Sequence, residues 1–297
     1  MAGADGPDLP PGREVELPGR GTTFVREVAG PPGAPALLLL HGWTATADLN
    51  FFRCYEPLGR HYRVIALDHR GHGRGIRSRR TFKLEDCADD AAALAEVLGL
   101  DHVTAVGYSM GGPVAQLLWK RHRSLVAGLV LCATARNFSS TREERWAFLG
   151  LAGLAAAARL APPPAREWLS QQYLQRRTYE EWARDEVSRH DWAAILAAGR
   201  AIGSFSSREW IGQVDVPTSV VLTTNDNVVP IRRQLRLAES IPGAGSFRVS
   251  GDHDVVVTQP DLFVPALLAA CERATGTTST ARGRSDQADS STGTGRN

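Results

Sequence analysis

Five apolar runs, each bounded by turn-forming residues, recur along the middle of the chain. They are ALLLLHG (36–42), YRVIALD (62–68), VTAVGYS (103–109), VAGLVLCAT (126–134) and TSVVLTTND (218–226). Runs that are apolar at nearly every position are typical of strands buried on both faces of a parallel sheet. Helix-like stretches lie between them, at 84–100 and 110–122. The alternation of strand and helix predicts a doubly wound α/β domain.

Residues 137–206 interrupt this alternation, because they contain no good strand pattern. Thr141 with Glu144, and Thr178 with Glu181, match the capping box that begins a helix. Helical patterns cover 141–160, 165–176, 178–188 and 191–202, with a stop at three consecutive prolines (162–164). The segment therefore predicts a helical cap, inserted into an α/β core made of residues 16–136 and 207–274.

The two ends of the chain have a different composition. Residues 1–15 begin with a polar stretch rich in proline and glycine, and residues 275–297 are mostly glycine, serine and threonine with scattered charges. Segments with so few apolar residues cannot offset the entropy lost on ordering. We expect both ends to be disordered.

Composition excludes several classes of protein. The net charge is +2 and the 34 Lys and Arg are spread out, so we expect no nucleic-acid partner. The four cysteines lack metal-ligand spacing, which argues against a zinc site or a disulfide framework and favours a reducing compartment. There is no signal-peptide pattern, and no apolar stretch reaches the ~20 residues that span a bilayer. We expect a cytoplasmic protein without a membrane span, a metal or a cofactor.

The stretch AVGYSMGGPVAQ (105–116) carries the main chemical signal. It sets Ser109 between Gly107 and Gly111, after a predicted strand and before a predicted helix. This Gly-x-Ser-x-Gly context matches a nucleophile elbow, in which a sharp turn exposes the serine at the carboxyl edge of the sheet. The helix that follows directs its N-terminal N–H groups to the same point. The alternative is a glycine-rich turn with an incidental serine.

A serine nucleophile needs a base, and the base needs an acid to orient it. His253 follows the strand-like SFRVS and comes after the last apolar run, so we predict that it is the base. Asp226 ends the run 218–226 and is the predicted acid. Asp252 and Asp254 are closer to His253 in sequence, but adjacent side chains seldom face the Nδ1 atom of the same ring.

Acyl transfer also needs N–H donors for the oxyanion of the tetrahedral intermediate. One is the backbone N–H of Met110, directly after the serine. The second is expected in HGWTAT (41–46), where Trp43 has the right position. We expect its indole to form a pocket wall, and His41 to hold this loop through hydrogen bonds.

Together, LLLLHGW, VIALDHRGHGRG, AVGYSMGG, NDNVVP and GDHD resemble the α/β-hydrolase superfamily in order and spacing, over residues 20–274. The chain looks most like its lidded serine esterases, lactonases and perhydrolases. The resemblance implies a triad of Ser109, Asp226 and His253, an oxyanion hole from Trp43 and Met110, and a helical cap. The chain departs from the family pattern at two positions: it has Gly75 where serine is usual, and Asp252 where glycine is frequent.

The cap is expected to select the substrate. Four tryptophans fall within it and could roof an apolar pocket or simply pack the cap onto the core: Trp146, Trp168, Trp182 and Trp192. An apolar roof favours a small-molecule ester that is uncharged and moderately hydrophobic. Enol-lactone hydrolysis, perhydrolysis or lyase chemistry on the same triad is the alternative. A non-catalytic receptor is a third reading, although such receptors normally lack a triad residue and none is missing here.

Overall fold

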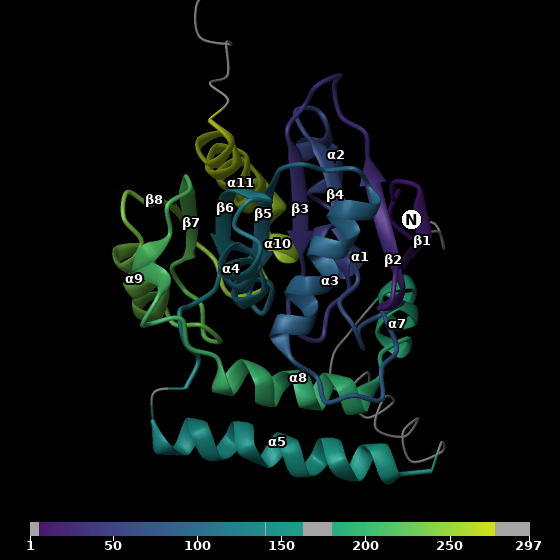
Figure 1. Cartoon of the computed structure of the whole chain (residues 1–297). Coiled ribbons are helices and arrows are strands. Elements are labelled where there is room, and N and C mark those ends of the chain that lie inside the picture. The colour runs from purple at the N-terminus through teal and green to yellow at the C-terminus, as the bar shows by residue number, and fades with distance from the viewer. Residues whose placement is uncertain (1–5, 140, 163–179, 277–297) are drawn as a thin grey trace, which may run out of the picture.

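An eight-stranded sheet forms the centre of the computed structural model, which describes residues 6–139, 141–162 and 180–276 (Figure 1). Its strand order is β1-β2-β4-β3-β5-β6-β7-β8. The strands are β1 (Gly12–Leu17), β2 (Gly21–Val28), β3 (Ala36–Leu40), β4 (Arg63–Leu67), β5 (Val103–Tyr108), β6 (Val126–Cys132), β7 (Thr218–Thr223) and β8 (Gly245–Val249). All pairings from β4 through β8 are parallel. The mostly parallel α/β architecture expected from the apolar runs is confirmed.

The antiparallel edge of the sheet was not expected. β1 pairs with β2, and β2 pairs with β4, both antiparallel. The expectation that residues 1–15 are disordered is therefore wrong for the part that begins at Gly12. The reason is that β1 lies at the sheet edge and buries only Val15 and Leu17, so it carries no continuous apolar run.

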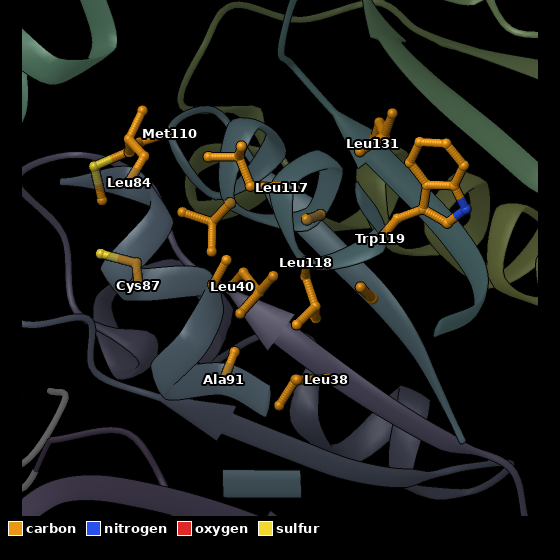
Figure 2. Packing of buried hydrophobic residues seen from close by; sticks show 14 of the residues in the cluster. Leu38, Leu40, Leu84, Cys87, Ala91, Met110, Leu117, Leu118, Trp119 and Leu131 are labelled. Atoms are coloured by element: carbon orange, nitrogen blue, oxygen red, sulfur yellow. The ribbon is translucent and has the colours of Figure 1, made fainter. Parts of the chain in front are cut away.

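Alternate side chains of each central strand enter two separate cores. Leu38 and Leu40 of β3 point toward one core, while Leu37 and Leu39 point toward the other. Helices α3 (Leu84–Val97), α4 (Gly111–Arg121) and α9 (Ile231–Ser240) cover the first face. The second face is covered by α1 (Ala47–Phe51), α2 (Tyr55–Gly59), α10 (Val255–Thr258) and α11 (Pro260–Thr275). Figure 2 shows Leu38 and Leu40 packed beneath the helices of the first face.

The cap lies beyond the carboxyl edge of the sheet. It contains α5 (Arg142–Leu160), α7 (Glu181–Ser188) and α8 (Trp192–Ser204), and α8 lies between α5 and the core (Figure 1). The helices expected at 141–160 and 191–202 are confirmed, as is the capping box of Thr141 and Glu144. The helix expected at 178–188 begins at Glu181, with Glu180 as its N-cap. The pattern at 165–176 and Thr178 lie outside the described residues.

None of the helices in the described ranges has the length and apolar character that crossing a bilayer requires. All four cysteines are buried as free thiols.

Candidate active site

Ser109 occupies a strained turn between β5 and α4. Its φ is +52°, in the left-handed region that non-glycine residues rarely adopt. Such a conformation costs about 1–3 kcal/mol and persists only where its surroundings enforce it. Here the Ser109 N–H donates to the carbonyl of Cys132 (2.9 Å), and the Ser109 carbonyl accepts from the Thr134 hydroxyl (2.8 Å). Strand β6 and the residues after it therefore hold the turn.

The two flanking glycines permit close backbone approach at this turn. A Cβ added to Gly107 would lie 2.3 Å from the Gly111 carbonyl oxygen. A Cβ added to Gly111 would lie 1.9 Å from the carbonyl oxygen of Leu40 on β3. Any side chain at either position would thus collide with backbone, which explains why the serine stands between glycines.

The structure brings the side chain of Ser109 to His253. The Ser109 Oγ and the His253 Nε2 are 2.8 Å apart. His253 lies in the loop between β8 and α10, and its backbone carbonyl accepts a hydrogen bond from the Tyr108 hydroxyl (2.6 Å). Tyr108 immediately precedes Ser109, so the same turn that exposes the serine also anchors the histidine loop.

Asp226 lies on the other side of the histidine ring. Its Oδ2 is 2.8 Å from His253 Nδ1, and its side chain is fully buried. The Oδ1 atom accepts the backbone N–H groups of Val228 (2.9 Å) and Val229 (2.7 Å). The Thr223 hydroxyl donates to Oδ2 (2.7 Å). The carboxylate is therefore fixed on both oxygens, with one of them directed at the ring.

Asp252 has different partners, although it adjoins His253 in sequence. Its Oδ1 accepts the backbone N–H groups of Asn227 (2.9 Å) and His253 (2.7 Å), and its Oδ2 accepts from the Asn227 amide (2.9 Å). These donors, the Asn227 N–H first, lower the pKa of this exposed carboxyl. Asp252 shapes the loop, while Asp226 faces the Nδ1 atom.

The loop after β3 approaches the serine closely. A Cβ added to Gly42 would lie 3.3 Å from the Ser109 Cβ. The Gly42 N–H donates to the Asn50 side chain (2.7 Å). Within the described part of the chain, the backbone N–H groups of Trp43 and Met110 donate to no other group. Met110 is the N-cap of α4 and is fully buried. Both groups are available as donors.

His41 supports this loop, as expected. Its Nδ1 donates to the Gly42 carbonyl (2.8 Å), and its Nε2 accepts the backbone N–H of His69 (2.9 Å). Burial holds the pKa of His41 well below its usual value, so the ring is neutral and both nitrogens are used. His41, His69, His72 and His190 form a buried cluster, with neighbouring ring centroids 4.4–5.7 Å apart. In the described ranges, no three His, Cys, Asp or Glu side chains group as a metal site requires.

The three cap tryptophans that the structure describes do not gather at one place. Trp146 is 62% exposed on α5, the helix farthest from the sheet (Figure 1). Trp182 contacts the ring of Phe52 edge-on and donates to Glu180. Trp192 lies beside His190, with ring centroids 5.9 Å apart. Trp168 lies outside the described residues. Trp146 thus has the surroundings of a surface residue, whereas Trp192 packs against the ring of His190.

Two polar residues that support the site were missed in the sequence. Gln234 of α9 donates to the Thr223 hydroxyl (2.7 Å) and lies 3.3 Å from Asp226 Oδ2. Asn50 of α1 accepts from Gly42. Both side chains are buried, at 0% and 5% exposure, and a polar residue on the inward face of a helix was the available signal.

A family model described as the alpha/beta hydrolase fold matches residues 35–190. The chain belongs to this family. A protein of Agrobacterium fabrum assigned as the carbamate hydrolase RutD is 29% identical to this hydrolase over 245 residues, 79% of this chain and 92% of that one. The non-heme chloroperoxidase of Streptomyces lividans is 28% identical over 84% of this chain and 96% of its own.

Solved structures show the same fold at lower identity. The enol-lactonase of Burkholderia xenovorans LB400 superimposes with a TM-score of 0.72 and 21% identity, over 87% of this hydrolase and 99% of that chain. A thermophilic esterase from Thermogutta terrifontis superimposes with a TM-score of 0.71 and 23% identity, over 89% of this chain and 99% of its own.

Proposed function

We propose that this hydrolase cleaves carboxylic esters through an acyl-enzyme on Ser109. The observation that carries the proposal is the continuous chain from Ser109 Oγ to His253 Nε2 (2.8 Å) and from His253 Nδ1 to Asp226 Oδ2 (2.8 Å). Both links have the length that proton transfer and ring orientation need.

In the proposed reaction, Ser109 Oγ attacks the ester carbonyl and His253 Nε2 takes the hydroxyl proton. Asp226 holds the ring by its Nδ1–H and stabilises the imidazolium that forms. The backbone N–H groups of Trp43 and Met110 stabilise the oxyanion. Collapse of the intermediate releases the alcohol, which takes the proton from His253. Water then attacks the acyl-enzyme by the same steps and releases the acid.

The proposed substrate is small to medium in size, uncharged and moderately hydrophobic. The indole of Trp43 follows Gly42, whose backbone approaches the serine, and it packs against Ile195 and Gly199 of α8; this apolar contact supports the choice. An anionic substrate would lose solvation against such apolar surfaces. The four free, buried cysteines suit the cytoplasm as the site of the reaction.

Enol-lactone hydrolysis or perhydrolysis on the same triad is the second candidate. Relatives with those names support it: the enol-lactonase above, and a bifunctional esterase/perhydrolase of Acinetobacter calcoaceticus that is 38% identical over 83 residues, 28% of this chain and 30% of that one. A panel of acyl esters of rising chain length, enol-lactones, and acetate with peroxide would separate these reactions by kcat/KM.

The proposed mechanism is tested by covalent labelling with a fluorophosphonate probe and by turnover of p-nitrophenyl esters. Ser109→Ala should fold normally, take no label, and lose turnover by on the order of 10⁴-fold or more. Ser188→Ala, on cap helix α7, is the matched control and should behave as wild type. Retention of a tenth of the activity in Ser109→Ala would exclude the serine mechanism.

A further inference from the structure

We propose that cap helix α8 positions the oxyanion loop, defined here as residues 42–46, and that His190 and Gly199 are positioning residues for it. The inference rests on the proposed function, in which the Trp43 N–H stabilises the oxyanion. In this proposal the cap orients an oxyanion donor in addition to covering the substrate.

The first contact joins the Trp43 side chain to the cap. The indole Nε1 donates to the backbone carbonyl of Ile195 in α8, at 2.8 Å. Ile195 is 1% exposed and Trp43 is half-buried, so this bond is partly shielded from water. Breaking the bond would leave the indole N–H without its acceptor, whereas the Ile195 carbonyl lies inside α8 and has a helical partner as well. Movement of α8 away from the core therefore pulls on Trp43 or breaks this bond.

The second contact is a close approach of α8 to the same indole. A Cβ added to Gly199 would lie 2.6 Å from Trp43 Cζ2 and 2.5 Å from Leu151 Cδ1. Glycine is unfavourable inside a helix, so its presence one turn after Ile195 has a packing reason. The indole fills the space that a side chain at residue 199 would need.

The third contact joins the cap to the backbone of the loop. His190 lies at the start of the α8 segment, and its Nδ1 accepts the Gly73 N–H (2.9 Å). That bond leaves Nε2–H as the donor to the Thr44 carbonyl (3.2 Å). Burial lowers the pKa of His190 to about 4, so the ring keeps this single-donor form at neutral pH. Thr44 needs such support, since its φ is +60°.

These contacts meet at the proposed oxyanion donor. On one side of Trp43, the core holds Gly42 through Asn50. On the other side, the cap holds the Thr44 carbonyl through His190. The Trp43 N–H lies between a residue that the core anchors and one that the cap anchors. Its direction is therefore set by how the cap sits on the core, and a displaced cap would misalign it.

The cap has further attachments that do not involve this loop. Glu186 of α7 pairs with Arg74 of the core (3.2 Å), and the Asp191 N–H donates to the Gly71 carbonyl (2.9 Å). Disturbing the Trp43 contacts should therefore leave the cap attached. The positioning role can then be separated from a general loss of folding.

Gly199→Ala and Gly203→Ala form a matched pair for the test. A Cβ at Gly203, one turn later in α8, would meet Phe148 of α5 at 2.2 Å and has no contact with the loop. Both substitutions raise the intrinsic helix propensity and both disturb cap packing. We expect Gly199→Ala to lower kcat for p-nitrophenyl acetate by about tenfold or more with KM changed less than about twofold, the pattern of a lost transition-state interaction. Gly203→Ala should match wild type in kcat.

Amide hydrogen exchange over residues 42–46 supplies a readout that needs no turnover. These amides should exchange faster in Gly199→Ala than in Gly203→Ala, at similar melting temperatures. If wild type hydrolyses esters and takes a fluorophosphonate label, but the two variants agree in kcat and exchange, the positioning role is overturned and the ester function stands. If wild type neither labels nor turns over, the ester function fails, and the exchange comparison still decides whether α8 holds the loop.

A second pair of variants tests the His190 bond. Asn at residue 190 keeps an oxygen that can accept from Gly73 but is too short to donate to Thr44, whereas Gln keeps an N–H near the Nε2 position. We expect His190→Asn to lower kcat and speed loop exchange, and His190→Gln to restore most of both. Equal behaviour of the two variants would remove His190 from the proposal.

Discussion

Asp226 contacts His253 from 27 residues away in sequence, with its Oδ2 atom 2.8 Å from the ring Nδ1, while the adjacent Asp252 turns its carboxylate to Asn227. The backbone explains the difference. Asp226 follows β7 and His253 follows the neighbouring parallel strand β8, so both loops emerge at the same edge of the sheet. Asp252 instead uses its carboxylate to join these two loops.

Exchanging each aspartate for asparagine should separate the two roles. Asp226→Asn should reduce kcat by on the order of 10⁴-fold, because the amide no longer enforces the Nδ1–H tautomer of His253. Asp252→Asn should keep most of kcat, with at most a shifted pH profile. Steady-state kinetics over pH 5–9, with melting temperatures for both variants, checks this. A larger loss in Asp252→Asn than in Asp226→Asn would reverse the assignment.

Acid should destabilise the fold, because burial lowers the pKa of His69 to about 3 and of His190 to about 4. Burial also keeps the pKa values of His41 and His72 well below the usual 6.5. As pH falls below about 6.5, these histidines bind protons in the unfolded chain but remain neutral in the folded chain. The free energy of unfolding therefore decreases until pH 3–4. Burial raises the pKa of Asp68 to about 7, so protonation of this carboxyl favours the folded state as pH falls. This single group opposes the effect of the four histidines. We expect the melting temperature to fall by about 10 °C between pH 7 and pH 4.

His69 offers a direct test of this mechanism. Neither of its ring nitrogens has a hydrogen-bond partner among the described residues, and the ring is 1% exposed. His69→Phe should therefore be neutral or stabilising at pH 7, and should reduce the acid loss of unfolding free energy by about 2 kcal/mol or more. His61→Phe, at an exposed position, is the control. Urea unfolding at pH 7 and pH 4.5 measures the difference, and an unchanged acid loss in His69→Phe would contradict the prediction.

Ester chain length should distinguish Trp192 from Trp146. Trp192 lies two residues after His190, which contacts the oxyanion loop, whereas Trp146 is 62% exposed on the outer helix. Each methylene that enters an apolar pocket contributes up to about 0.8 kcal/mol, roughly fourfold in kcat/KM. We expect Trp192→Ala to lower kcat/KM for a p-nitrophenyl hexanoate more than for the acetate, and Trp146→Ala to leave the ratio unchanged. Equal ratios in both variants would oppose an apolar roof that includes Trp192.

Removal of residues 277–297 should leave melting temperature and turnover nearly unchanged. The composition of this segment offers little apolar surface to bury, and α11 already ends at Thr275 with Gly276 in the left-handed conformation. Differential scanning fluorimetry and ester turnover of the shortened chain test this. A fall of several degrees would show that the segment contributes to the fold.

The sequence by itself determined the central sheet and the serine turn. β3 to β7 lie within the apolar runs because strands buried on both faces are apolar at nearly every position. The Gly-x-Ser-x-Gly turn was readable because its requirement is local, with backbone 1.9 Å from a Cβ at Gly111. The antiparallel strands β1 and β2 were not readable, since their exposed and partly exposed positions interrupt the continuous apolar signal.

Only the tertiary structure decided which distant groups meet. Gln234 reaches Thr223 beside Asp226 because α9 packs back onto β7, and Trp43 meets Ile195, 152 residues away in sequence, because α8 packs onto the core. The amphipathic pattern of a helix shows which face is buried but not which partner it meets. The same limit applies to the cap, where Trp146 and Trp192 read alike in sequence. One is exposed on α5 and the other lies beside His190, because packing, not residue type, assigns each tryptophan its neighbours.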